Sequence, residues 1–117
     1  MILEIVTFNL PAGQDRAKEL DAVRGVTAKW AANPDLVRKQ FVFGLGDAAG
    51  IGAGVYVWPS IEAAEKAHND EWREAVKART GGYPTMQYFD LLAEVDNSRD
   101  TITEWSADGK AHEVERA

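Results

Sequence analysis

His68, one of two histidines among 117 residues, lies in a segment whose spacing predicts burial. At about 100° per residue, a helix over residues 60–80 would place it at the centre of an apolar stripe. That stripe comprises Ile61, Ala64, His68, Trp72, Ala75, Val76 and Arg79. An imidazole with an unperturbed pKa of about 6.5 can accept a proton near neutral pH. His68 is therefore the candidate catalytic base. The alternative is a core histidine bonded to a carbonyl or to a tyrosine hydroxyl.

Aromatic residues suited to holding a flat ligand occur near this histidine. Tyr56 and Trp58 share one face of the segment 51–58 with two glycines, which lack side chains and can leave room above a strand. The substrate-binding candidates are Trp72, Tyr56, Trp58, Tyr88 and Asn9. Asn9 has two interpretations: a turn residue after the first strand, or a donor to a substrate oxygen.

Several classes of function are disfavoured by composition. No cysteine is available for a disulfide, a thiolate metal site or a nucleophile. No second metal ligand accompanies His68 on its stripe, and no phosphate-binding loop is present, so neither a metal nor a cofactor is expected. A net charge of -6 without a basic block argues against nucleic acid. No apolar run approaches the roughly 20 residues that span a bilayer, so we expect no membrane partner and a cytoplasmic location.

The predicted elements alternate in the order β-α-β-β-α-β. Strands are expected at 2–8, 36–45, 51–58 and 85–95, and helices at 15–32 and 60–80. This order predicts an α+β, ferredoxin-like fold, in which an antiparallel four-stranded sheet carries two helices on one face. One domain of residues 1–97 would hold all of these elements.

Both faces of this sheet are predicted to be apolar. Segment 51–58 places Ile51, Ala53, Val55 and Val57 on the side opposite Tyr56 and Trp58. The helices can cover only one side, so a second copy of the sheet is expected on the other. The sequence thus predicts a homodimer.

Residues 98–117 form a polar C-terminal tail with two large apolar residues, Ile102 and Trp105. Two interpretations stay open. The tail either frays, as termini often do, or docks through these residues, for example onto a partner subunit.

The chain resembles the dimeric α/β-barrel superfamily, and within it the YdhR-type monooxygenases related to antibiotic-biosynthesis monooxygenase domains. The resemblance rests on "ILEIVTFNLPAGQ", "GAGVYVWPSIEAAEKAH" and "YFDLLAEVDN", and it covers residues 1–97. It implies a dimeric barrel with a pocket between sheet and helices in each subunit. Haem degraders of this fold place a tryptophan before the histidine on the second helix. Here His68 precedes Trp72, which makes haem degradation a minor alternative.

The resemblance implies three hypotheses. The first is a cofactor-independent monooxygenase, an oxidoreductase acting on a small phenol or polyketide-like aromatic. The second is an isomerase or lyase that uses the same pocket for proton transfer alone. The third is a dimeric ligand-binding protein without catalytic activity, in which His68 is structural.

Overall fold

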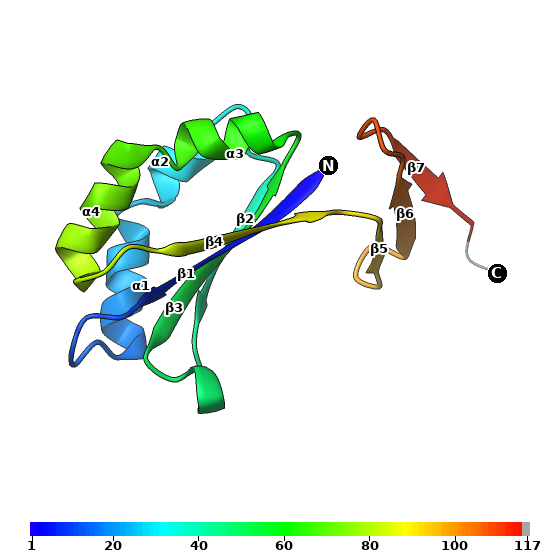
Figure 1. Ribbon diagram of the computed structural model, residues 1–117. Helices are drawn as coiled ribbons and strands as arrows, with labels where there is room; N and C mark the ends of the chain where they lie inside the picture. Colours follow the sequence, from blue (N-terminus) through cyan, green and yellow to red (C-terminus); the bar gives the residue numbers. More distant parts are fainter. Residues whose placement is uncertain (116–117) are drawn as a thin grey trace.

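A computed structural model describes residues 1–115 and contains two antiparallel sheets (Figure 1). The larger sheet has the strand order β2-β3-β1-β4. Its strands are β1 (Ile2–Asn9), β2 (Arg38–Phe43), β3 (Ile51–Trp58) and β4 (Thr85–Asp90). A short 3-10 helix, η1 (Gly46–Ala48), lies between β2 and β3. The antiparallel four-stranded core and the predicted order of its elements are confirmed.

Four helices gather on one side of this sheet (Figure 1). They are α1 (Arg16–Arg24), α2 (Thr27–Ala31), α3 (Ile61–Ala67) and α4 (Asp70–Thr80). Strand register places Glu4 beside both Tyr56 and Tyr88, and Tyr56 beside Lys39. These four side chains therefore share the face that the helices cover, because paired residues point to the same side of a sheet. None of the helices in the described part of the chain is long and apolar enough to cross a membrane.

Each predicted helix is divided in two, which corrects the sequence-based assignment. The second helix stops at His68, whose backbone N–H closes the last turn of α3 on the Ala64 carbonyl. Its backbone then leaves the helical region, at φ -102° and ψ 52°. Asn69 starts α4, because its side-chain oxygen accepts a hydrogen bond from the Trp72 N–H at 2.9 Å. The first helix breaks at Gly25 and Val26, where no side chain caps the start of α2.

The predicted strand 85–95 is also divided, and its second half belongs to a different sheet. The Leu91 N–H still reaches the Met1 carbonyl, whereas the Leu92 carbonyl accepts from Trp105. From there the chain forms a three-stranded meander of β5 (Ala93–Asp96), β6 (Thr101–Trp105) and β7 (Ala111–Val114). This meander stands apart from the four helices (Figure 1).

The predicted tail is therefore folded over most of its length. Ile102 lies on the middle strand and pairs with Val95 and Val114, and Trp105 ends the same strand. An ion pair of 3.0 Å between Arg38 and Glu94 joins the meander to β2. The last two residues of the tail lie outside the described residues, and docking onto a partner stays a prediction.

Candidate active site

A buried carboxylate lies at the centre of the helix-covered face. Glu4, on the inner strand β1, has no exposed surface. Its carboxylate accepts a hydrogen bond from Trp58 Nε1 at 2.9 Å, and its two oxygens lie 3.0 and 2.9 Å from Nδ1 of His68. A buried carboxylate needs such donors, since leaving water without them costs several kcal/mol. The Glu4 carboxylate thus holds the imidazole of His68 in place.

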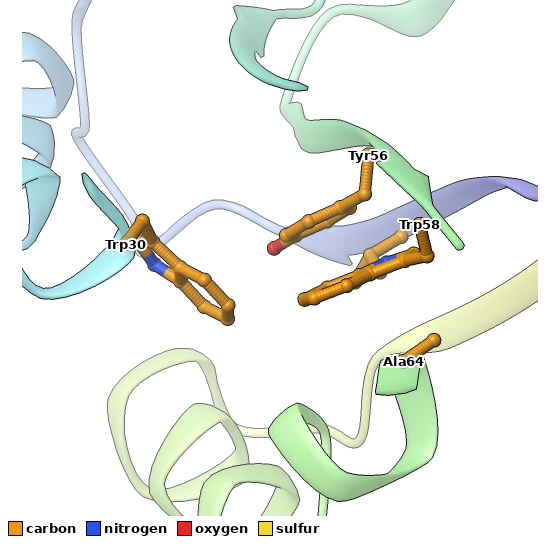
Figure 2. Packing of buried hydrophobic residues seen from close by; sticks show 5 residues of the cluster. Trp30, Tyr56, Trp58 and Ala64 are labelled. Atoms are coloured by element: carbon orange, nitrogen blue, oxygen red, sulfur yellow. The ribbon is translucent and has the colours of Figure 1, made fainter. Parts of the chain in front are cut away.

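Aromatic rings enclose His68. Its ring centre lies 4.1 Å from that of Trp72, 4.6 Å from Tyr56 and 5.4 Å from Trp30. Figure 2 shows Tyr56 and Trp58 side by side, with Trp30 approaching from across the cluster. The second imidazole nitrogen, Nε2, is buried and has no hydrogen-bond partner among the described residues. When His68 is neutral and Nδ1 carries the proton, Nε2 is a free acceptor.

A cavity of about 770 Å³ opens between the sheet and helices α1, α2 and α4. Its aromatic walls come from Phe8, Trp30, Phe41, Phe43, Tyr56 and Trp72. Small-molecule sites commonly occupy about 300–1,000 Å³ and are lined mainly by apolar and aromatic side chains. The cavity therefore has the size and lining of a site for a compound with several rings.

Lys39 extends from β2 into this cavity. Its ammonium nitrogen lies 3.6 Å from the ring centre of Tyr56, 4.2 Å from Phe41 and 4.6 Å from Trp30. Gly54 leaves room for this position, because a Cβ there would lie 2.9 Å from the Lys39 nitrogen. Burial lowers the pKa of Lys39 from 10.5 to about 7. The positive charge of Lys29 adds to this shift, and the negative charge of Glu4 opposes it. The amine therefore titrates near neutral pH.

This lowered pKa predicts a pH-dependent stability. Between pH 7 and 10.5 the unfolded chain binds the Lys39 proton and the folded chain has lost it, so this group makes stability rise with pH in that range. The variant Lys39→Met lacks this titrating group and therefore its pH-dependent contribution to stability. We expect it to be more stable than the wild type at pH 7, and the difference to shrink by pH 9. Urea unfolding at both pH values measures this, with the exposed Lys66→Met as control. If the difference in stability between Lys39→Met and the wild type is the same at both pH values, the pKa of Lys39 is not lowered by folding.

Two tyrosines beside the carboxylate are held in their neutral form. Burial raises the pKa of Tyr88 to about 12, and the charge and a hydrogen bond of Glu4 add to the effect. Burial, together with Glu4, also raises the pKa of Tyr56. Both hydroxyls therefore remain donors at neutral pH, and neither is a base.

The structure separates the residues that the sequence grouped as one site. Tyr56 and Trp72 line the large cavity. Trp58 is fully buried and lines neither cavity, and Asn9 lies at the exposed end of β1, outside both cavities. His68 and Tyr88 instead line a smaller polar hollow of about 530 Å³. The rings of Tyr56 and Trp72 therefore separate His68 from the large cavity.

Sequence reasoning missed Glu4 and Lys39, although period-two alternation carried a signal for both. Glu4 shares its strand face with Ile2, Val6 and Phe8, and Lys39 shares its face with Phe41 and Phe43. A charged side chain within an apolar face must find a partner or a cavity. Gly52 was expected to leave space for a ligand, but the ring of Phe8 fills it, since a Cβ there would lie 2.6 Å from that ring.

No protein-family model matches the chain, and a search of curated sequences also finds no match. Solved structures do match. A crystal structure of an antibiotic biosynthesis monooxygenase has 14% identity and a TM-score of 0.58, over 79% of this chain and 99% of that one. A putative antibiotic biosynthesis monooxygenase from Caulobacter crescentus has 19% identity and a TM-score of 0.57, over 78% and 89%. The Rv0793 protein of Mycobacterium tuberculosis has 11% identity and a TM-score of 0.59, over 82% and 100%. The chain is thus similar in fold to antibiotic biosynthesis monooxygenase domains, as the sequence resemblance implied.

Proposed function

We propose that the protein is a cofactor-independent monooxygenase that oxidises a small phenol or polyketide-like aromatic. The observation that carries this proposal is the aromatic-walled cavity of about 770 Å³ between sheet and helices. The shared fold with antibiotic biosynthesis monooxygenases supports it by analogy.

In this chemistry the substrate itself supplies the electrons. Removal of a proton from a phenol or an activated methylene leaves an electron-rich anion, which reduces O2. One oxygen atom enters the substrate as a carbonyl, and the other leaves as water with two substrate hydrogens. Both hydrogens come from the methylene carbon or, in a phenol, one comes from the hydroxyl and one from the ring carbon that is oxidised. The protein needs to supply a base, a dry cavity and groups that stabilise the anion.

His68 is the proposed base. Glu4 holds Nδ1 and thereby fixes the tautomer that leaves Nε2 free to accept a proton, as in other carboxylate–imidazole pairs. From the large cavity, the substrate proton can reach this buried atom when one of the intervening rings moves aside. Trp72 is the cavity-lining ring nearest to the imidazole.

Oxygen consumption tests the proposal. The purified protein is mixed with a panel of phenols and aromatic ketones of one to three rings, in air and under argon. Oxygenation predicts substrate loss in air, with one O2 consumed for each substrate, and no loss under argon. Turnover that persists under argon would instead indicate the isomerase or lyase. Binding without turnover would indicate a ligand-binding protein.

The sheet face opposite the helices is the proposed dimer interface. It carries Leu3, Ile5, Val42, Val55 and Phe89, and Val42 and Phe89 are 44% and 47% exposed in the single chain. An apolar sheet face of this kind is a common site of association. We propose that a second copy of the chain covers it.

Placing a charge at the centre of this face should dissociate the dimer. Val55 pairs with Ile5 on one side and Gln40 on the other, so Val55→Glu would bury a carboxylate between the two sheets. We expect the wild type to sediment as a dimer at micromolar concentration and the variant as a folded monomer. A wild-type chain that sediments at 12.9 kDa would contradict the proposal.

A further inference from the structure

The cavity carries a charge opposite to that of the chain. The formal net charge is -6. The charged residues around the cavity are nevertheless four cations and one carboxylate, namely Arg16, Lys29, Lys39, Arg79 and Glu19. The carboxylate is partly neutralised, since Arg79 Nη1 lies 3.7 Å from Glu19 Oε1. The cavity therefore has a surplus of positive charge, and this surplus attracts anions.

Lys39 is the cation among aromatic rings. Three rings surround its nitrogen, and among residues 1–115 no carboxylate forms an ion pair with it. Aromatic faces attract an ammonium, but they do not replace the water that it loses on burial. An anionic ligand oxygen at this position would supply the missing charge-assisted hydrogen bond.

We infer that the cavity binds its aromatic ligand as an anion, a carboxylate or a phenolate, with the charged oxygen on Lys39 and the ring against Trp30 and Tyr56. This inference deepens the proposed function and rests on its assignment of the cavity as the substrate site. The exposed side chains of Arg16 and Lys29 would guide the anion toward the cavity.

Anion binding has a consequence for protonation. With a pKa of about 7, most of the Lys39 amine is neutral at pH 8 in the free protein. A bound anion favours the ammonium form, so the complex takes up a proton. The charges of Glu4 and Lys29 also act on this amine, and the Tyr56 ring beneath it is held neutral by burial. Proton uptake therefore distinguishes Lys39 from the guanidinium groups, whose charge does not change with pH.

Two probes of equal shape and different charge test the inference. These are 2-naphthoate, ionised at pH 8, and neutral 2-naphthamide. Their dissociation constants are measured by quenching of tryptophan fluorescence. Proton uptake is measured calorimetrically in two buffers of different ionisation enthalpy. We expect the wild type to bind naphthoate at least 10-fold more tightly than the amide, with uptake approaching one proton. Lys39→Met should abolish both the preference and the uptake yet still bind the amide, and Lys66→Met should keep both.

The remaining outcomes separate this inference from the proposed function. Equal affinity of the wild type for both probes would overturn anion recognition and leave the aromatic cavity standing. Retention of the preference by Lys39→Met would also overturn it, because another cation would then bind the charge. Failure of both probes to bind would refute the inference together with the assignment of the cavity as a substrate site.

Discussion

Replacing His68 by Asn is expected to lower kcat/KM for an aromatic substrate by about 10²-fold or more, with little loss of stability. The Asn amide can keep a donor near the position of Nδ1, where it still satisfies the Glu4 carboxylate. It deletes Nε2, the atom proposed to accept the substrate proton. Steady-state kinetics and urea unfolding on the same preparation measure the two effects. If kcat/KM per folded molecule stays at the wild-type value, His68 is structural.

The variant His68→Phe preserves the ring but does not distinguish a catalytic role of His68 from a structural one. Phe retains the bulk between Tyr56 and Trp72 but removes the imidazole donor from Glu4, in a position without exposure. Breaking a buried pair from one side costs about 3–5 kcal/mol. We therefore expect this variant to be both inactive and unstable. The contrast between the two variants separates loss of the base from loss of the hydrogen bond to Glu4.

Removing the carboxylate should also have a large effect on stability. Glu4→Ala leaves Trp58 Nε1 and His68 Nδ1 without their acceptor and opens a void on the inner strand, so a loss of about 3–5 kcal/mol in the free energy of unfolding is expected. Glu4→Gln keeps the shape but turns an amide NH2 toward one of the two donors, and a smaller loss of about 1–3 kcal/mol is expected.

Urea unfolding at pH 7 measures both changes. The exposed Glu113→Ala on β7 is the matched control and should stay within about 0.5 kcal/mol of the wild type. A Glu4→Ala variant as stable as this control would mean that the hydrogen bonds of the buried carboxylate contribute no net stability.

Local signals were sufficient to predict the core of the fold. Strands β1 and β3 are long, rich in β-branched and aromatic residues, and bounded by turns, so their existence follows from the sequence. The breaks were harder to predict. Asn69 caps α4 within a segment that keeps helical periodicity on both sides, and "DLLAEV" contains no turn residue at the point where the chain changes sheets. A distant partner, the Trp105 N–H on the Leu92 carbonyl, decides the change of sheet, whereas the cap at Asn69 is local but is not distinguished by the apolar spacing around it.

The candidate site was only partly predictable, for a similar reason. The burial of His68 followed from helical spacing, but its partner lies on a strand 64 positions away in sequence. No spacing rule connects those two positions. The Lys39 nitrogen lies against Gly54, on the neighbouring strand, where there is no side chain, a relation that depends on strand register.

The buried position of Glu4 also bears on how the chain avoids misfolding. Strand β1 is apolar on both sides, with Ile2, Val6 and Phe8 on one and Leu3 and Ile5 on the other. A slip of one residue would exchange these sides at little hydrophobic cost. In the slipped state, however, the Trp58 indole and the His68 imidazole would lose their acceptor. The carboxylate therefore disfavours the slipped pairing, and a Glu4→Leu chain would lack this penalty.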